Sequence, residues 1–363
     1  MTLISAQQML GAQGWVSGGS VTVADGLIAA VGSNAARPDH AYLIPGYIDI
    51  QVNGLRDIDL ASAEPGRWPT VPRELATHGV TSWLPTLISR PLSEYGPWLD
   101  AVGELMSQQS PAASRILGAH LEGPWLGRRP GAHLDIAAGA VDLGWIAQLP
   151  DLVKVVTLCP ERQGALEAIG ALRDRNVVVG LGHTDADHAT ANAAFDRGAR
   201  LLTHCFNANP SMHHRAPGIV GAALARDDVV VSIIADGHHV HPDMIRIAMR
   251  AKGPDKVVLI SDASGWESGS LGSQPVRLVN AAPILDDGTL AGSAVTLDEA
   301  VRFVVEHCGV CAEDAVRSAS TVPADLLGHP EIGRIARGAR ADLVALDDQL
   351  HVRQVWLAGQ PVR

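Results

Sequence analysis

The sequence predicts an α/β fold, a (β/α)8 TIM-like barrel with a small β-sandwich beside it. Eight apolar runs rich in β-branched residues recur along the chain, and most are continuous, as expected for parallel strands buried on both faces. Segments with helical spacing separate these runs, and such an alternation is typical of a barrel. The runs are 43–52, 80–87, 116–121, 152–158, 177–181, 201–205, 229–235 and 257–261.

The chain length and the segments between the runs agree with one barrel. At 363 residues, the chain is long enough to bury a large α/β core. Residues 165–175 and 186–197 have helical spacing, and the second segment is followed by Gly198, a residue type that often ends a helix. An amphipathic stretch at 297–307 predicts another helix.

The two ends of the chain do not continue the alternation. Residues 3–32 are predicted to be short strands with turns at 17–20 and 24–26, and residues 333–356 are again rich in strand formers. We therefore expect both ends to build the sandwich. The predicted domains are 1–43 with 331–363 for the sandwich and 44–330 for the barrel.

Charge and composition exclude several classes of partner. The net charge of −11 provides no basic field for nucleic acid or an anionic membrane, and the eight tryptophans are too scattered to form a stacking platform. No apolar run approaches the roughly 20 residues that span a bilayer, and the N-terminus lacks a signal-peptide pattern. These features predict a cytoplasmic protein without nucleic-acid or membrane partners.

Cysteine usage favours reduced thiols over a disulfide scaffold. The chain has four cysteines, Cys159, Cys205, Cys308 and Cys311, at irregular spacing. The last two form a C-x-x-C match, but no second pair completes a zinc site, and the match closes a helical stretch instead of opening a redox helix. We therefore assign it no metal or redox role.

Three of the predicted strands end in a carboxylate or a histidine. These residues are Glu122, His183 and His204, and the C-terminal strand ends of a barrel carry its active site. One Glu and two His form a catalytic zinc ligand set, which leaves a fourth position for water and lowers the pKa of that water to about 7. A fourth run ends at Asp262, which could manage protons. The pattern predicts a metal-assisted hydrolase.

Each assignment has a structural alternative. A lone histidine at a strand end is more often a hydrogen-bonded structural residue, although a Glu in an apolar run is costly to bury unpaired. His120 lies two residues before Glu122 on the same predicted strand, so it is an alternative ligand. Asp262 could instead cap a helix N-terminus.

An ordered set of motifs resembles the N-acetylglucosamine-6-phosphate deacetylases of the amidohydrolase superfamily. The motifs are PGYID at 45–49, HLEGP at 120–124, GH at 182–183, THCFNA at 203–208, RAPG at 215–218, ADGHHV at 235–240, SDA at 261–263 and LAGS at 290–293. The resemblance implies a sandwich and barrel, and hydrolysis of the acetamide of N-acetyl-D-glucosamine 6-phosphate to D-glucosamine 6-phosphate and acetate.

The resemblance also implies roles for individual residues. It makes Glu122, His183 and His204 the metal ligands and Asp262 the acid and base. It further implies substrate contacts for a larger set. That set is Ala132 and His133 near the acetyl carbonyl, Asn207 and Ala208 against the sugar, and a pocket wall of Asp236, Gly237, His238, His239, Leu290, Ala291 and Gly292.

The phosphate contacts implied by the resemblance are Arg215 and His239. In the family a neighbouring subunit supplies that arginine, which implies a homodimer. The alternative is that Arg215 is a surface cation near Asp227 and Asp228.

Two departures from the family pattern bear on the metal and the substrate. Many amidohydrolases end the first strand in His-x-His, whereas this chain has Gln51-Val52-Asn53, and amides bind a cation more weakly than imidazole binds zinc. We therefore expect one divalent ion per subunit, with Zn²⁺ the expected metal. The second departure is Asn209 together with the loop at 264–268.

Two classes of function remain open at this point. The first is an enzyme, either the glucosamine-series deacetylase, its galactosamine-6-phosphate counterpart or another amide hydrolase. The second is a non-catalytic barrel that serves as a binding or assembly module. Retention of Glu122, His183, His204 and Asp262 together favours an enzyme, because a scaffold has no need for four mutually dependent polar groups.

Overall fold

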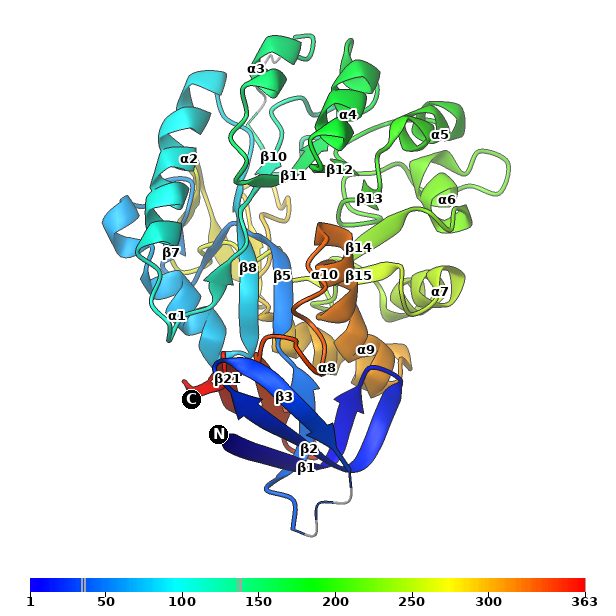
Figure 1. Cartoon of the computed structure of the whole chain (residues 1–363). Coiled ribbons are helices and arrows are strands. Elements are labelled where there is room, and N and C mark those ends of the chain that lie inside the picture. The colour runs from blue at the N-terminus through cyan, green and yellow to red at the C-terminus, as the bar shows by residue number, and fades with distance from the viewer. Residues whose placement is uncertain (34, 36, 135, 137–138, 363) are drawn as a thin grey trace.

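A computed structural model describes residues 1–33, 35, 37–134, 136 and 139–362 of the chain (Figure 1). Its centre is a barrel of parallel strands surrounded by helices, and a separate sheet lies beneath it. The predicted barrel with a separate β unit from the two chain ends is therefore confirmed. In the described residues, no helix combines the length and the apolar character that a membrane crossing requires.

Each predicted strand run overlaps one strand of the barrel, and neighbouring strands pair in parallel in chain order. The strands are β5 (Tyr47–Val52), β8 (Val80–Leu87), β10 (Ala119–Glu122), β11 (Val153–Leu158), β12 (Val178–Leu181), β13 (Leu201–Leu202), β14 (Val230–Ile234) and β15 (Val257–Ile260). The run predicted as one strand at 43–52 is in fact two. Its first part belongs to β4 (His40–Pro45) in the terminal sheet, and Gly46 separates β4 from β5.

The helices cover the outside of the barrel. They are α1 (Thr70–Thr77), α2 (Leu92–Ser107), α3 (Leu143–Ala147), α4 (Ala165–Asp174), α5 (His188–Arg197), α6 (Gly218–Ala225), α7 (Pro242–Lys252), α8 (Leu297–Cys308), α9 (Ala312–Ser318) and α10 (Thr321–Leu327). The helices predicted at 165–175, 186–197 and 297–307 correspond to α4, α5 and α8. Apolar residues inside the N-terminal half of the barrel, among them Ile48, Leu84 and Val258, pack against Leu326 of α10. Because this apolar packing fills the N-terminal half, polar side chains can gather at the C-terminal end of the barrel.

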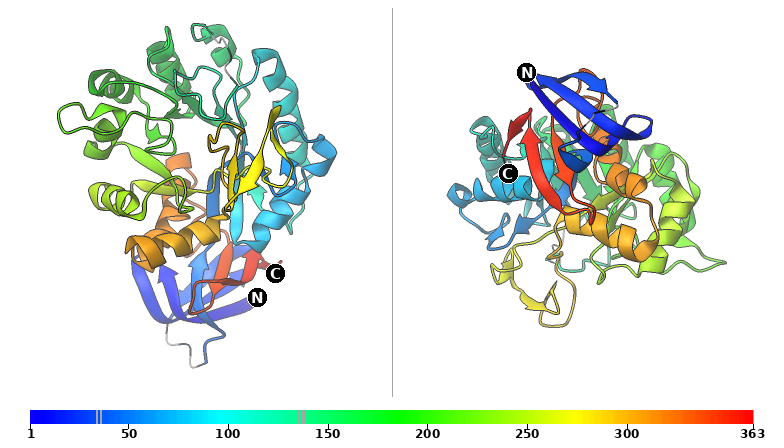
Figure 2. Two further views of the ribbon diagram at one scale, coloured as in Figure 1. Left: turned by 180° about the vertical axis from the view of Figure 1, so that it is seen from behind. Right: turned by 90° about the horizontal axis from the view of Figure 1, so that it is seen from below.

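The terminal segments form one seven-stranded sheet, in the order β22-β21-β20-β4-β1-β2-β3 (Figure 2). Its remaining strands are β1 (Thr2–Gly11), β2 (Gly14–Ala24), β3 (Leu27–Gly32), β20 (Leu343–Leu346), β21 (Val352–Leu357) and β22 (Gln360–Pro361). β4 joins the two chain ends, because β1 pairs with it on one side and β20 on the other. The domain division at 43 and 331 stays a prediction, and β4 itself ends at Pro45.

One predicted turn in this sheet is wrong. Residues 17–20 lie inside β2, where Gly19 is opposite Ala6 of β1. A Cβ atom on Gly19 would lie 2.3 Å from the Cβ of Met9, so glycine here makes room for a core side chain and does not mark a turn. The turn predicted at 24–26 is correct, and Asp25 and Gly26 both have positive φ there.

Short hairpins extend the ends of two barrel strands. β6 (Gly54–Leu55) and β7 (Ile58–Asp59) follow β5, and two hairpins follow β15 before α8 begins. The latter are β16 (Ser270–Leu271) with β17 (Gln274–Pro275), and β18 (Arg277–Val279) with β19 (Ala282–Ile284). They appear in yellow at one side of the barrel in Figure 2.

Candidate active site

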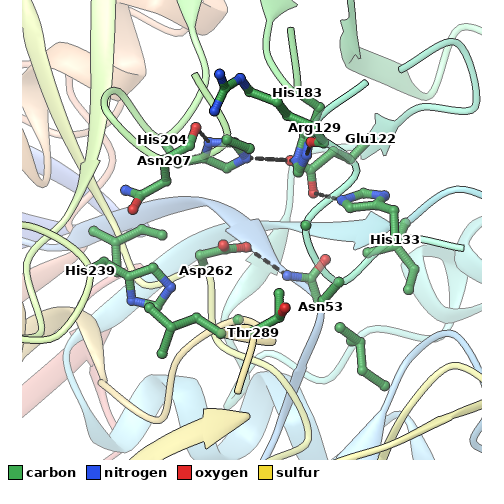
Figure 3. Close-up of a pocket in the computed structure, with 18 of the residues that line it drawn as sticks. Asn53, Glu122, Arg129, His133, His183, His204, Asn207, His239, Asp262 and Thr289 are labelled. Carbon is green, nitrogen blue, oxygen red and sulfur yellow. Dashed lines mark hydrogen bonds and ion pairs between the residues drawn. The ribbon is translucent and has the colours of Figure 1, made fainter. Parts of the chain in front are cut away.

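A cavity of about 480 Å³ opens at the C-terminal ends of the barrel strands (Figure 3). Of the residues predicted for the site, those lining it are Glu122, Ala132, His133, His183, His204, Asn207, Ala208, His239, Asp262, Leu290 and Gly292. Arg215, Asp236, Gly237, His238 and Ala291 are not part of the lining. The barrel topology thus gathers side chains from strands that are far apart in the sequence.

The backbone at three strand ends is held in an unusual conformation. His183, His204 and Asp262 each lie two residues beyond a barrel strand and have φ values of +50°, +33° and +48°. A non-glycine residue in this left-handed region costs on the order of 1 to 3 kcal/mol, and such residues cluster at functional sites. The conformation turns these side chains away from the strand direction and toward the cavity shown in Figure 3.

The three predicted ligands converge within hydrogen-bond distance of one another. His204 Nε2 lies 2.9 Å from Glu122 Oε1 and 3.0 Å from His183 Nε2, and His183 Nε2 lies 3.3 Å from the same carboxylate oxygen. All three side chains are buried. Burial lowers the pKa of His183 to about 4, so its imidazole is neutral near neutral pH.

The opposite nitrogens of the two histidines determine which atoms face the cavity. His183 Nδ1 lies 2.9 Å from the carbonyl oxygen of Arg129, and His204 Nδ1 lies 3.2 Å from that of Asn207. A carbonyl oxygen can only accept, so each Nδ1 carries a hydrogen and donates it. In the neutral tautomer each Nε2 then presents a lone pair toward Glu122. One carboxylate and two imidazole lone pairs converging in this way fit a divalent metal ion.

His133 also lies in this cluster, but its hydrogen bonds point to another role. Ligand atoms of Glu122, His133 and His183 lie within 4.8 Å of one another, so proximity alone would make His133 a ligand. The backbone N–H of Ser89, however, donates to His133 Nδ1 at 3.1 Å. The hydrogen of neutral His133 therefore sits on Nε2, 3.4 Å from Glu122 Oε2, and this residue acts as a donor into the cavity.

Both ring nitrogens of His120, the alternative ligand, have hydrogen-bond partners in the protein. Its Nδ1 lies 3.2 Å from the carbonyl oxygen of Ile50, and its Nε2 lies 2.9 Å from the hydroxyl of Thr157. Burial lowers its pKa to about 4, so it is a neutral core residue. This excludes the ligand role that its spacing from Glu122 had left open.

Asp262 is held by the side chains of Gln51 and Asn53, the two amides that were expected to be weak metal ligands. Gln51 Nε2 and Asn53 Nδ2 donate to its Oδ1 at 3.0 and 2.7 Å. Gln51 Nε2 also lies 3.1 Å from Glu122 Oε1, so it links the acid to the ligand cluster. Burial, followed by the charge of Glu122, raises the pKa of Asp262 to about 6. No helix begins at Asp262, so the capping alternative is wrong.

His239 reaches the cavity from a turn that Asp236 orders. The Asp236 carboxylate accepts the backbone N–H groups of His238 and His239 at 2.9 and 2.8 Å, and its Oδ2 lies 2.6 Å from His239 Nδ1. The hydrogen bond from His239 lowers the pKa of Asp236, although burial opposes this. Asp236 thus orients His239, whereas His238 is exposed.

Arg215 is exposed and lines a different hollow, formed with residues 185–189 and 216–218. Its backbone N–H donates to His213 Nδ1, and Asp228 is paired with Arg226 instead. Within one described chain, Arg215 therefore does not share the cavity of Glu122.

The cavity also contains groups that the sequence reasoning did not select, chiefly Arg129 and Thr289. Both lie on loops without strand or helix periodicity, so no sequence pattern marks them. Asn53 Oδ1 and Asn207 Nδ2 are buried without a hydrogen-bond partner among the described residues. Unpaired buried polar groups next to a cavity are expected where a polar ligand binds.

Comparison with known proteins supports the same kind of site. A model of the amidohydrolase family matches residues 42–362. The chain belongs to the amidohydrolase family. The N-acetylgalactosamine-6-phosphate deacetylase of Escherichia coli O157:H7 is 36% identical over 99% of this chain and 98% of that protein. The N-acetylglucosamine-6-phosphate deacetylase of Bos taurus is 38% identical over 88% of this chain and 83% of that protein.

A solved structure extends the similarity to three dimensions. A mutant of the N-acetyl-D-glucosamine-6-phosphate deacetylase from Mycobacterium smegmatis, in complex with N-acetyl-D-glucosamine-6-phosphate, superposes with a TM-score of 0.91. It is 31% identical, and the match covers 99% of both chains. The predicted family resemblance and the predicted class, a hydrolase acting on amide bonds, are confirmed. The family is metal-dependent, and the cluster of Glu122, His183 and His204 could bind the ion.

Proposed function

We propose that this chain hydrolyses the acetamide of N-acetyl-D-glucosamine 6-phosphate to D-glucosamine 6-phosphate and acetate, with one zinc ion per subunit. The observation that carries the proposal is the convergence of Glu122, His183, His204 and Asp262 on one cavity. Similarity to a deacetylase whose structure contains that sugar phosphate supports the choice of substrate.

Glu122, His183 and His204 would hold the metal, through one carboxylate oxygen and two Nε2 atoms. A divalent ion at this position polarises a carbonyl and lowers the pKa of water. Gln51 and Asn53 donate hydrogen bonds through their amide nitrogens to Asp262. With these two groups engaged as donors, a single metal site is the expected arrangement.

Asp262 moves the proton. Its Oδ1 is occupied by two donors, so Oδ2 is the oxygen free to act in the cavity. Its raised pKa, about 6, suits a base that works near neutral pH. Oδ2 takes a proton from the attacking water as the new C–O bond forms, and returns it to the amide nitrogen as the C–N bond breaks. The products are acetic acid and the free amine, which at neutral pH become acetate and the ammonium form.

Three other residues orient the substrate. His133 Nε2–H donates to the acetyl carbonyl oxygen and assists charge development there. His239, oriented by Asp236, contacts the 6-phosphate. Arg215 of a second subunit supplies the remaining phosphate contact in a homodimer, because in its own chain this residue lies outside the cavity. We place the enzyme in the cytoplasm, a compartment in keeping with its four free cysteines.

The galactose-series epimer is the second candidate substrate, because the E. coli relative that matches 99% of the chain is named for it. An acetate-release assay on the two N-acetylhexosamine 6-phosphates and on plain N-acetylglucosamine tests the proposal. We expect the highest kcat/KM with N-acetylglucosamine 6-phosphate. Preference for the epimer would reassign the sugar, and equal rates on phosphorylated and plain sugar would refute the phosphate contacts.

A further inference from the structure

One fully buried carboxylate near the site has no role in the mechanism above. Asp49 lies in the middle of β5 and is 0% exposed. It does not line the cavity, and within the part of the chain that the structure describes it makes no ion pair. Burial raises its pKa to about 7, so a charged Asp49 costs stability. A carboxylate that is costly to bury and makes no ion pair in the described part of the chain calls for an explanation through the groups it hydrogen-bonds.

Asp49 lies between β5 and β15, the two neighbouring barrel strands that share no strand ladder among the described residues. The eight strands are hydrogen-bonded in order from β5 round to β15, but β15 and β5 are the two ends of that order. Beyond the C-terminal ends of these two strands, Ala263 O accepts the backbone N–H groups of Asn53 and Gly54 at 2.8 and 3.0 Å. Nearer the middle of β5, the Asp49 side chain takes the place of a backbone acceptor. The backbone N of Ser261 lies 3.4 Å from Asp49 Oδ1 and 3.3 Å from Oδ2.

The two residues that Asp49 contacts are next to the groups that perform the chemistry. Ser261 immediately precedes Asp262, and Asp49 Oδ1 also accepts the backbone N–H of Gln51 at 3.2 Å. The side chain of Gln51 in turn holds Asp262 Oδ1 and Glu122 Oε1. The Asp49 carboxylate therefore fixes the backbone beside Asp262 and that of Gln51, whose side chain holds Asp262.

We propose that Asp49 is a positioning residue, which fixes Asp262 over the scissile nitrogen by bridging the backbone of β5 to that of β15. This inference rests on the proposed function. A misplacement of about 1 Å at a catalytic group can lower a rate by about 10²-fold. The step most sensitive to such a shift is protonation of the leaving amine, because an amine cannot leave as an anion.

An asparagine at position 49 cannot reproduce the bridge that the carboxylate makes. In Asp49→Asn, the NH₂ group must occupy the position of either Oδ1 or Oδ2. In either case a donor faces the N–H of Ser261 at about the present distance of 3.3 to 3.4 Å. The bridge therefore loses one or both contacts while the volume of the side chain is unchanged.

The test compares two substrates that differ in the need for leaving-group protonation. One is the proposed amide, and the other is its S-acetyl analogue, with sulfur in place of the 2-nitrogen. A thiolate, whose conjugate acid has a pKa of about 8.5, leaves without a proton from Asp262. For Asp49→Asn, we expect kcat for the amide to fall by at least about 10²-fold. The kcat for the thioester, which needs Asp262 only to deprotonate the water, should fall by at least about 10-fold less. KM and metal content should stay near wild type.

Asp59→Asn is the matched control. Asp59 is also a buried carboxylate that accepts backbone N–H groups, from Ala61 and Gly272, and among the described residues it makes no hydrogen bond to β15 or Gln51. It should leave the amide-to-thioester ratio unchanged. If Asp49→Asn cannot be purified folded, Asp49→Ser, which removes the carboxylate that accepts the Ser261 N–H without adding volume, should change the ratio in the same direction.

Two results would overturn the proposal. The first is an equal loss of kcat on both substrates, which would show that Asp49 does not act through protonation of the leaving amine. The second is a lower melting temperature with unchanged kcat per folded molecule, which would make Asp49 a purely structural residue. Failure of the wild-type protein to release acetate from the amide is a separate result, which would refute the proposed function and not the bridge.

Discussion

Replacing Asp262 by Asn tests the assignment of the proton carrier. Two donors, from Gln51 and Asn53, converge on Oδ1 of this residue. The oxygen of the new amide must therefore stay at the Oδ1 position, and its NH₂ group is forced to the Oδ2 position, which these donors leave free. The variant keeps its shape but presents a donor where the reaction needs a proton acceptor.

The expected loss follows from this geometry. General acid–base catalysis contributes about 10² to 10⁴-fold, and Asp262 serves both water deprotonation and amine protonation. We therefore expect kcat to fall by at least about 10³-fold, which corresponds to about 4 kcal/mol in the activation free energy. Substrate affinity and metal content should be retained, because Glu122, His183 and His204 are unchanged.

The assay is steady-state acetate release, together with equilibrium binding of the intact substrate and elemental analysis of the variant. Asp298→Asn serves as a control, because Asp298 is a buried carboxylate that does not line the cavity. It should retain wild-type kcat near neutral pH. If Asp262→Asn loses its metal and unfolds, or if it keeps more than about a tenth of the wild-type kcat, the proton-carrier reasoning is wrong.

Three further predictions concern the metal, the phosphate and stability. His204→Ala should lose both the bound ion and the activity, because only two of the three ligands remain; full activity would refute the ligand set. Arg215→Ala should lower kcat/KM for the phosphorylated sugar by about 30-fold or more, but hardly at all for the plain sugar. Mixed dimers of Arg215→Ala and Asp262→Asn subunits should regain activity if the arginine crosses the interface, and no recovery would argue against that. Although burial opposes it, hydrogen bonds from His78 and Thr296 lower the pKa of Asp298 to about 2. Because this folded-state pKa is depressed, its contribution of about 2 kcal/mol is present above about pH 4 and is lost as the pH falls toward about 2. Urea unfolding should therefore show Asp298→Asn to be destabilised near neutral pH and nearly equal to wild type at about pH 2.

The strand ends of the barrel were predictable because two independent signals coincide there. An apolar run that stops at Glu122 or His204 gives both the strand and the polar residue at its active-site end. Parallel strands that lie side by side bring their C-terminal ends together, so polar residues at several of these ends are expected to meet there. The fold and the proposed ligand set therefore follow from the same local pattern.

Other features depend on contacts that no local pattern contains. The hydrogen bond from Gln51 to Asp262 joins residues 211 positions apart, so the sequence shows only that Gln51 is a poor ligand. His133 lies on a loop, and only the family resemblance selected it. Asp49 was hidden inside an apolar run, and Gly19 suggested a turn although the side chain of Met9 requires a glycine in a strand there.

Zinc titration of the metal-free protein, followed by acetate release from N-acetylglucosamine 6-phosphate, tests the central claim most directly. The single ligand set of Glu122, His183 and His204 predicts no acetate without metal and a linear rise in rate that stops at about one ion per chain. A plateau at two ions would contradict the single site. Absence of acetate at every zinc concentration would contradict the proposed reaction itself.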